Sequence, residues 1–146
     1  MRGIRPSASA RCTSSPVQNV TLSELRLLFS VSCTAPSWDD RQEYVYPSGG
    51  IKVRKLSEKG FYAKAGFKGD ELFGMNLFTA GSSKMVTITE GEIDALSVAQ
   101  MLKSGYTNPV VSLPSATPSK KLWENCADWL GSFEKIILSV DRKSVV

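Results

Sequence analysis

The chain has 146 residues, a formal net charge of +4 and no histidine. This length allows one ordinary domain, or a small domain with a tail, and the mild positive charge permits a polyanionic partner. The missing histidine excludes a histidine base or metal ligand. Cys12, Cys33 and Cys126 form no CxxC pair, which argues against zinc and a disulfide framework and fits a reducing compartment. No apolar run approaches membrane-spanning length, so no membrane partner is expected.

Residues 1–40 are rich in Ser and Arg and contain no acidic residue before Glu24. Three interpretations fit this composition: a poorly ordered tail, an acid-poor organelle-targeting peptide, or an out-of-frame stretch that is not native to the protein. We favour the tail or the frame error, because composition is a weak targeting signal. A cytoplasmic location is therefore expected rather than an organellar one.

Residues 41–80 predict a small antiparallel β-subdomain and a linker. Three runs of strand-like composition, 43–46, 51–56 and 61–64, are separated by turn-rich connectors. The apolar stretch 72–78 follows, and we interpret it as a linker that packs this subdomain onto the next domain.

Basic residues dominate the predicted β-subdomain. Between residues 51 and 68 the only acid is Glu58, and the basic residues are Lys52, Arg54, Lys55, Lys59, Lys64 and Lys68. Strand alternation places Lys52 and Arg54 on one face. Tyr46, Phe61 and Tyr62 are interleaved with the basic residues, a pattern found in proteins that bind single strands. The alternative is a solvated basic face over an aromatic core.

Residues 85–141 alternate strand, helix, strand, helix, strand, which predicts a parallel α/β sheet. The strands are expected at 85–89, 110–113 and 135–140, and they are apolar on both faces, as in a sheet covered by helices. One helix is expected at 93–103. A second begins near Thr117, its predicted cap, with Pro118 in first position, and ends at Gly131. Its predicted apolar face consists of Leu122, Trp123, Cys126, Ala127, Trp129 and Leu130.

The sequence Thr-Glu-Gly-Glu-Ile-Asp-Ala-Leu-Ser, residues 89–97, ends the first of these strands and begins a helix. Gly91 is expected to allow a tight turn. Glu90 follows the strand and Asp94 lies in the first helical turn facing it, where open α/β sheets place their ligands. Two carboxylates there suit Mg²⁺. The alternative is an acidic first turn that the helix dipole favours.

The predicted loop 114–121 lies on the same edge of the sheet as Glu90. Its hydroxyl groups, on Ser115, Thr117 and Ser119, could donate to a phosphate, and Lys120 or Lys121 could reach it. Plain turn and cap chemistry explains the same residues equally well.

Residues 89–97 resemble the opening motif of the TOPRIM fold, Glu-Gly-x-x-Asp-x-Leu-Ser. Together with Leu-Phe-Gly-Met-Asn-Leu-Phe at 72–78 and Pro-Val-Val-Ser-Leu-Pro-Ser at 109–115, residues 43–141 resemble the phage bifunctional DNA primase–helicases, which are related to the mitochondrial replicative helicase. The resemblance implies a TOPRIM-like Rossmannoid parallel sheet preceded by a small basic antiparallel subdomain. The implied parent activity is RNA primer synthesis on single-stranded DNA.

The resemblance also implies a set of site residues. Glu90 would be the catalytic proton acceptor or a metal ligand, and Asp94 and Asp141 would complete a Mg²⁺ site. Basic residues would hold DNA or nucleotide phosphates, with Lys52, Arg54 and Lys68 at matching positions and Lys120 added from the loop. Expected partners are a single-stranded DNA template, nucleoside triphosphates and a helicase domain or subunit, in the cytoplasm of a phage-infected bacterium.

The sequence departs from the family pattern at its end. An Asp-x-Asp should follow the third strand, but Lys143 stands where the second Asp is expected. Residues 141–146 back-translate to a string that resembles a sequencing-library adapter, so we expect the native chain to end at about Val140. The TOPRIM domain at 81–141 would then be truncated, with a non-native tail at 142–146. Such a chain would be inactive alone.

Two other functions stay open. Topoisomerases and nucleases also use this fold, although the stretch 72–78 argues against them. A binding module without chemistry is favoured by Lys143.

Overall fold

The computed structural model describes residues 31–34, 41–58, 60–102 and 108–141. Four strands form an antiparallel sheet in the order β1-β2-β3-β4: β1 (Val31–Thr34), β2 (Arg41–Val45), β3 (Ile51–Lys55) and β4 (Gly60–Lys64). The last three confirm the predicted β-subdomain. The sequence did not predict β1, which pairs with β2 at the edge of this sheet.

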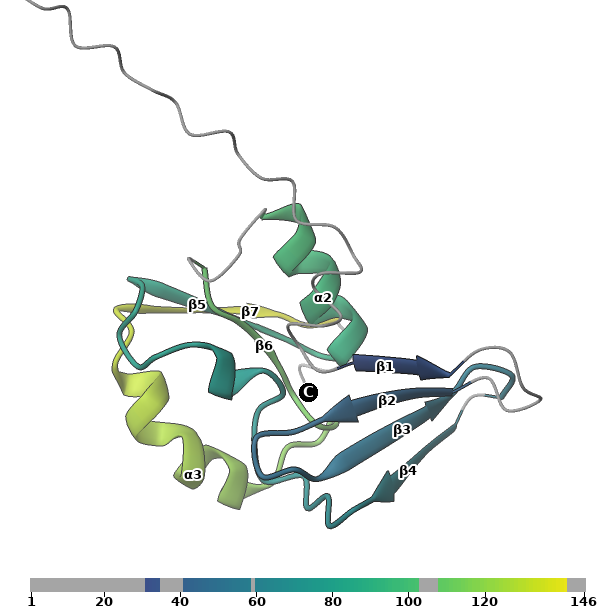
Figure 1. The fold of residues 1–146 in the computed structure, drawn as a ribbon. Helices are drawn as coiled ribbons and strands as arrows, with labels where there is room; N and C mark the ends of the chain where they lie inside the picture. Colours follow the sequence, from purple (N-terminus) through teal and green to yellow (C-terminus); the bar gives the residue numbers. More distant parts are fainter. Residues whose placement is uncertain (1–30, 35–40, 59, 103–107, 142–146) are drawn as a thin grey trace, which may run out of the picture.

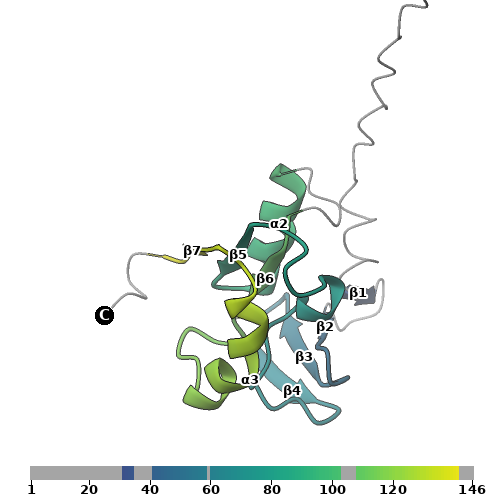
Figure 2. The ribbon, with the colours of Figure 1, turned by 90° about the vertical axis from the view of Figure 1, so that its left-hand side faces the viewer.

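Three parallel strands form the second sheet in the order β6-β5-β7: β5 (Met85–Thr89), β6 (Val110–Ser112) and β7 (Lys135–Ser139). The helices between them are α2 (Glu92–Met101) and α3 (Lys120–Gly131). They lie on opposite sides of the sheet, and the antiparallel sheet lies beside it (Figures 1 and 2). This arrangement confirms the predicted mixed α/β fold with a parallel sheet.

Burial follows from this layering. The central strand β5 is covered on both faces, so Val86, Thr87, Ile88 and Thr89 are all buried. The edge strand β7 is more exposed, with Leu138 at 62%. Parallel strands place their carboxyl ends at one edge, and here Thr89 lies in register with both Ser112 and Ser139. The residues that follow the three strands therefore meet at that edge.

The linker 72–78 joins the two sheets into one core. Phe73 forms an antiparallel bridge with Ser112, the last residue of β6. Each of the two residues donates its backbone N–H to the carbonyl of the other, with N···O distances of 3.0 and 3.2 Å. Leu72 and Phe73 are fully buried, and Tyr44 and Tyr46 pack against the Phe73 ring. The short 3₁₀ helix η1 (Met75–Leu77) then leads toward β5. The packing role predicted for this linker is confirmed.

The prediction for the second helix was wrong at its start. Helix α3 begins at Lys120 and its cap is Ser119, whose Oγ accepts a hydrogen bond from the Leu122 N–H at 3.2 Å. Pro118 therefore precedes the cap rather than occupying the first helical position, and Thr117 lies in the loop before it.

Two residues of the predicted apolar face of α3 are exposed. Leu122, Cys126, Trp129 and Leu130 are buried, but Ala127 and Trp123 are not, with Trp123 at 38% exposure. Burial raises the pKa of the Cys126 thiol, which fits the inert core residue that we predicted. Trp129 donates its indole N–H to the Phe78 carbonyl at 3.0 Å.

Neither of the two α-helices within the described residues is long and apolar enough to cross a membrane. Of the predicted tail 1–40, residues 31–34 form β1, and residues 1–30 and 35–40 lie outside the described residues. The segment 142–146, which includes Lys143, also lies outside them.

The burial pattern of α3 predicts opposite outcomes for two adjacent substitutions. Leu122→Ala should lower the free energy of unfolding by about 2–5 kcal/mol, because it leaves a cavity in the core. Trp123→Ala should cost less than about 1 kcal/mol, because its ring is largely outside the core. Urea unfolding followed by circular dichroism measures both, and equal losses would contradict the orientation of α3.

Candidate active site

The two carboxylates of the sequence motif lie at the carboxyl edge of the parallel sheet. Glu90 directly follows β5, and Asp94 lies in the first turn of α2. Both line one cavity of about 740 Å³ between the two sheets. The structure therefore brings together the pair of acids that the spacing predicted.

Gly91 allows this geometry for a different reason from the one expected. Its backbone has φ −133° and ψ 162°, an extended conformation that any residue adopts, so no special turn requires glycine. A Cβ at this position would instead lie 3.2 Å from Oδ2 of Asp94. The missing side chain thus leaves room for the Asp94 carboxylate to fold back over the strand–helix junction.

The third predicted acid is near but does not complete a cluster. The Asp141 backbone N–H donates to Oε2 of Glu90 at 3.1 Å, and Asp141 lines a second cavity of about 350 Å³ together with Glu90 and Asp94. No group of three acids or cysteines within the described residues is close enough to hold a metal ion. Glu90 and Asp94 alone still fit Mg²⁺, which needs only one or two protein carboxylates besides water and phosphate oxygens.

A buried acid that was not among the predicted site residues holds the cationic side of the cavity in place. Glu92, in the first turn of α2, has a side chain only 4% exposed, and its Oε1 lies 2.8 Å from the Lys52 ammonium. The Tyr46 hydroxyl donates to the same oxygen at 2.6 Å. Burial, reinforced by the Glu92 charge, raises the pKa of Tyr46 well above its usual value, so the hydroxyl keeps its proton and remains a donor.

Lys52 is therefore an anchored cation rather than a mobile surface lysine. Besides Glu92, it donates to the carbonyl of Pro114 at 2.7 Å, and this carbonyl belongs to the loop that follows β6. An ammonium has three N–H donors, so these two bonds leave one for another acceptor. Acidic residues at helix starts are common, but only the tertiary structure shows that Glu92 meets Lys52.

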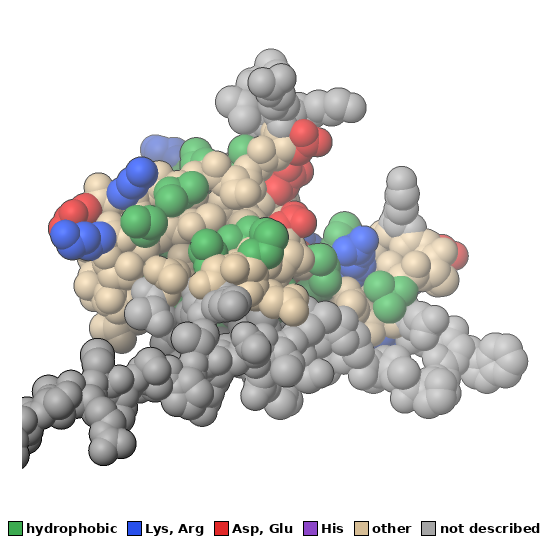
Figure 3. Space-filling model, turned by 90° about the horizontal axis from the view of Figure 1, so that it is seen from above, with side chains coloured by type: hydrophobic (Ala, Val, Ile, Leu, Met, Phe, Trp, Pro, Cys, Tyr) green, Lys and Arg blue, Asp and Glu red, His purple; other side chains and the backbone are tan. Residues whose placement is uncertain are grey.

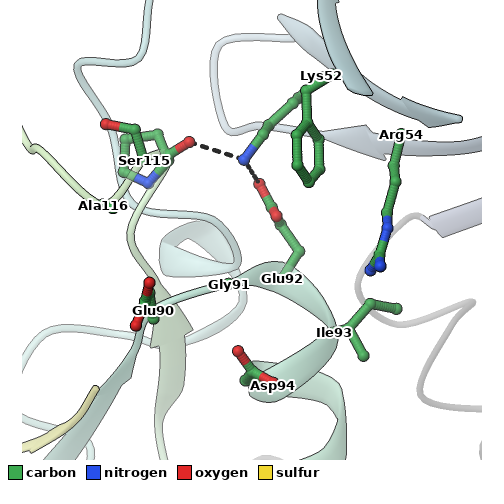
Figure 4. Close-up of a pocket in the computed structure, with 11 residues that line it drawn as sticks. Lys52, Arg54, Glu90, Gly91, Glu92, Ile93, Asp94, Ser115 and Ala116 are labelled. Atoms are coloured by element: carbon green, nitrogen blue, oxygen red, sulfur yellow. Dashed lines mark hydrogen bonds and ion pairs between the residues drawn. The ribbon is translucent and has the colours of Figure 1, made fainter. Parts of the chain in front are cut away.

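Arg54 reaches the same cavity from β3 and is the more exposed of the two cations. Its guanidinium carbon lies 5.9 Å from the centre of the Phe61 ring, and the Lys52 nitrogen lies 4.6 Å from it. Figure 4 shows Lys52 and Arg54 entering from the antiparallel sheet while Glu90 and Asp94 stand on the β5–α2 side. The cavity thus has an acidic wall and a cationic wall.

The other predicted phosphate contacts lie elsewhere. Neither Lys68 nor Lys120 lines the cavity, and Lys120 pairs with Glu124 one helical turn away on α3. Lys121 pairs with Asp70 at 2.8 Å, and this contact lowers the pKa of Asp70. Ser115 does line the cavity, but its hydroxyl donates to the Thr117 carbonyl, as a turn residue would.

The space-filling view shows the same separation of charge on the outer surface. Acidic side chains gather in one part of this face, and a group of cationic side chains lies beside them (Figure 3). An anion with a bound divalent cation would be electrostatically complementary to both the acidic and the cationic parts of this surface.

Comparison with known proteins supports a functional assignment. The chain is 36% identical over 102 residues to the DNA helicase/primase of Enterobacteria phage T3. It superposes on the primase fragment of the bacteriophage T7 primase–helicase with a TM-score of 0.71 at 32% identity, over 84% of this chain and 54% of that one. The chain is a homologue of the phage DNA primase–helicases. No family model matches it.

A second solved structure agrees. It contains the T7 lagging-strand DNA polymerase interacting with primase domains bound to an RNA/DNA hybrid and dTTP, and one of its chains superposes with a TM-score of 0.67 at 32% identity, over 84% of this chain and 65% of that one. The match to the T3 protein covers 68% of the present chain but only 17% of the length of the T3 protein. The family resemblance inferred from the motifs is thereby confirmed.

The buried ion pair predicts a large, specific stability effect. Lys52→Met should lower the free energy of unfolding by about 3 kcal/mol or more, because it leaves the Glu92 charge buried without its cation. Lys52→Met combined with Glu92→Gln should recover part of this loss, since the neutral amide can still accept from Tyr46. Urea unfolding of the singles and the double gives the coupling energy.

Lys64→Met is the matched control, because Lys64 pairs with Glu43 on the same sheet but with a side chain 51% exposed. Its cost should stay below about 1 kcal/mol. A Lys52→Met protein as stable as Lys64→Met would show that the Lys52–Glu92 contact does not hold the sheets together.

Proposed function

We propose that this chain carries the nucleotidyl-transfer site of a DNA primase, which joins ribonucleotides into a primer on single-stranded DNA. The observation that carries the proposal is the cavity with Glu90 and Asp94 on one wall and Lys52 and Arg54 on the other, in a homologue of the T7 primase fragment. This pairing suits a magnesium–triphosphate complex, because the ion needs carboxylates and the phosphates need cations.

The charges around the cavity support a role for the metal. Two cationic residues, Lys52 and Arg54, line it against three acidic ones, Glu90, Glu92 and Asp94, so the formal sum is −1. A triphosphate alone would be repelled by the acidic wall. Bound Mg²⁺ would neutralise that wall and polarise the phosphates, which is most of what catalysis of phosphoryl transfer requires.

The side chains around the cavity would have separate roles in the proposed reaction. Glu90 and Asp94 would hold the ion, and Glu90 is the candidate proton acceptor for the attacking 3′-hydroxyl. Arg54, together with the remaining N–H of Lys52, would orient the phosphate oxygens. From the family pattern Asp141 is the candidate third acid. In this structure its backbone N–H donates to the Glu90 carboxylate, and its own carboxylate is not part of a three-acid cluster among the described residues. Positioning of this kind supplies rate without any covalent intermediate.

The partners follow from the same proposal. The T7 primase domains in the related complex are bound to an RNA/DNA hybrid and dTTP. For this chain we propose a single-stranded DNA template, nucleoside triphosphates and a helicase domain or subunit, in the cytoplasm of a phage-infected bacterium. Because Lys143 replaces the expected second acid, we further propose that the 146-residue chain binds nucleotide but does not by itself synthesise primers.

The alternative is a nucleic-acid-binding module without chemistry, and Lys143 is the specific observation that favours it. The two functions differ in their need for metal. A binding module needs the cations of the antiparallel sheet only, whereas the transferase site also needs Glu90 and Asp94.

Magnesium should stabilise the folded chain by mass action. At a concentration about 100 times the dissociation constant, a single bound ion adds about 2.7 kcal/mol to the free energy of unfolding. The Glu90→Gln, Asp94→Asn double variant should stay folded and lose this gain. Thermal scans with Mg²⁺, with and without a nucleoside triphosphate, measure the shift in melting temperature.

Glu124→Gln, Asp128→Asn is the matched control, since it removes two acids with the same spacing from the exposed side of α3. It should keep the full Mg²⁺ response. An equal Mg²⁺-dependent shift in melting temperature in both double variants would show that Glu90 and Asp94 do not hold the ion. Ribonucleotide incorporation on a single-stranded template, assayed in parallel, separates a site that binds from one that also reacts.

A further inference from the structure

Phe61 occupies an unusual position for an aromatic side chain. It lies on β4 and is 58% exposed, whereas Tyr44, Tyr46 and Phe73 are buried in the core. A single exposed apolar residue needs no explanation by itself. Phe61, however, lines the same cavity as the two acids and the two cations of the candidate active site.

The sheet register explains how Phe61 reaches the cavity. Arg54 of β3 is the direct partner of Phe61 on β4, and Lys52 is the partner of Ala63. Because side chains alternate along a strand, Lys52, Arg54 and Phe61 share one face of the sheet. Tyr62 points to the opposite face of the sheet and does not line the cavity. Its hydroxyl accepts a hydrogen bond from Arg41 instead.

The surroundings of the ring match an aromatic platform more closely than a packing residue. The Lys52 nitrogen lies 4.6 Å from the ring centre and the Arg54 guanidinium carbon lies 5.9 Å from it. The cavity also has apolar lining from Ile93, Pro114 and Ala116. Both cations therefore make cation–π contacts with the ring. An aromatic ring in contact with phosphate-binding cations is a combination with which proteins hold nucleotides regardless of base identity.

We propose that Phe61 is the platform on which the base of the bound nucleoside triphosphate stacks, while its phosphates lie toward Arg54, Lys52 and the two acids. This inference rests on the proposed function and names a recognition element for its substrate. The cavity volume of about 740 Å³ lies within the range of about 300–1,000 Å³ typical of small-molecule sites. A single nucleotide is therefore a better match than a DNA strand, which would need an extended groove.

Stacking accepts every base, because every base has a π-face. Phe61 should therefore strengthen binding of purine and pyrimidine triphosphates alike. It should contribute nothing to the binding of inorganic tripolyphosphate, which offers the same anionic oxygens without a base. This contrast separates stacking from a general effect on the cavity.

The experiment compares Phe61→Leu, Phe61→Trp and wild type for binding of ATP, UTP and tripolyphosphate, each with Mg²⁺, by isothermal titration calorimetry. Phe61→Leu should weaken ATP and UTP by about 5- to 150-fold and leave tripolyphosphate unchanged. Phe61→Trp should bind both nucleotides at least as tightly as wild type. Its added indole fluorescence should be quenched by ATP but not by tripolyphosphate.

Tyr62→Leu is the matched control, because it removes an exposed aromatic ring from the same strand on the face away from the cavity. It should leave all three affinities unchanged. Thermal scans check that each variant is folded, which is expected because the Phe61 ring is mostly outside the core.

The possible results are distinguishable. If ATP, UTP and tripolyphosphate bind but Phe61→Leu weakens none of them, the stacking platform is wrong and the proposed function stands. Equal weakening of all three ligands would assign Phe61 to the shape of the cavity and overturn stacking. A single-stranded oligonucleotide is titrated in the same way, and if Phe61→Leu weakens its binding but not that of ATP or UTP, the ring serves the template and the stacking platform for the nucleotide is wrong. If wild type binds none of the three ligands, the proposed function and this inference fall together.

Discussion

The candidate site depends on one buried ion pair, between Lys52 of the antiparallel sheet and Glu92 of α2. The two side chains are 12% and 4% exposed, and the ammonium nitrogen lies 2.8 Å from the carboxylate oxygen. A buried charge without a partner is so costly that neither residue can leave the contact without destabilising the fold. Because Lys52 also donates to the Pro114 carbonyl, the pair joins the antiparallel sheet, α2 and the loop after β6 at one point.

Each sheet contributes one kind of charge to the cavity that this junction closes. The parallel sheet presents Glu90 and Asp94 at its carboxyl edge, while β3 of the antiparallel sheet presents Arg54 beside Lys52. Magnesium and phosphate need opposite partners, so a site for both is most easily built where two elements of different charge meet. The bridge between Phe73 and Ser112 sets the distance between the sheets, because it pairs the linker directly with β6.

The homology to the T3 and T7 proteins gives this geometry a chemical interpretation. Similarity to a primase fragment assigns the chain to a family, but the cavity shows which side chains could do the work. The outcome differs from the motif-based assignment at two lysines. Lys68 and Lys120 were expected at the phosphates but do not line the cavity. Lys68 lies in the segment after β4, and Lys120 is the first residue of α3, where it pairs with Glu124.

The local pattern of the chain was enough to determine the three parallel strands, the placement of Glu90 and Asp94 on one edge, and the basic character of the β-subdomain. These features arise from short-range rules: alternation within a strand, the strand–helix junction, and the common direction of parallel strands. The described fold confirms them, and the comparisons confirm the family that the motifs at 72–78, 89–97 and 109–115 indicated. Tertiary structure alone decided that Glu92 pairs with Lys52, that Phe61 rather than Tyr46 or Tyr62 enters the cavity, and that Trp123 stays outside the core. Those outcomes depend on contacts between residues far apart in the chain, such as Lys52 and Glu92, which are 40 positions apart. No local period encodes which distant side chain will share a buried site.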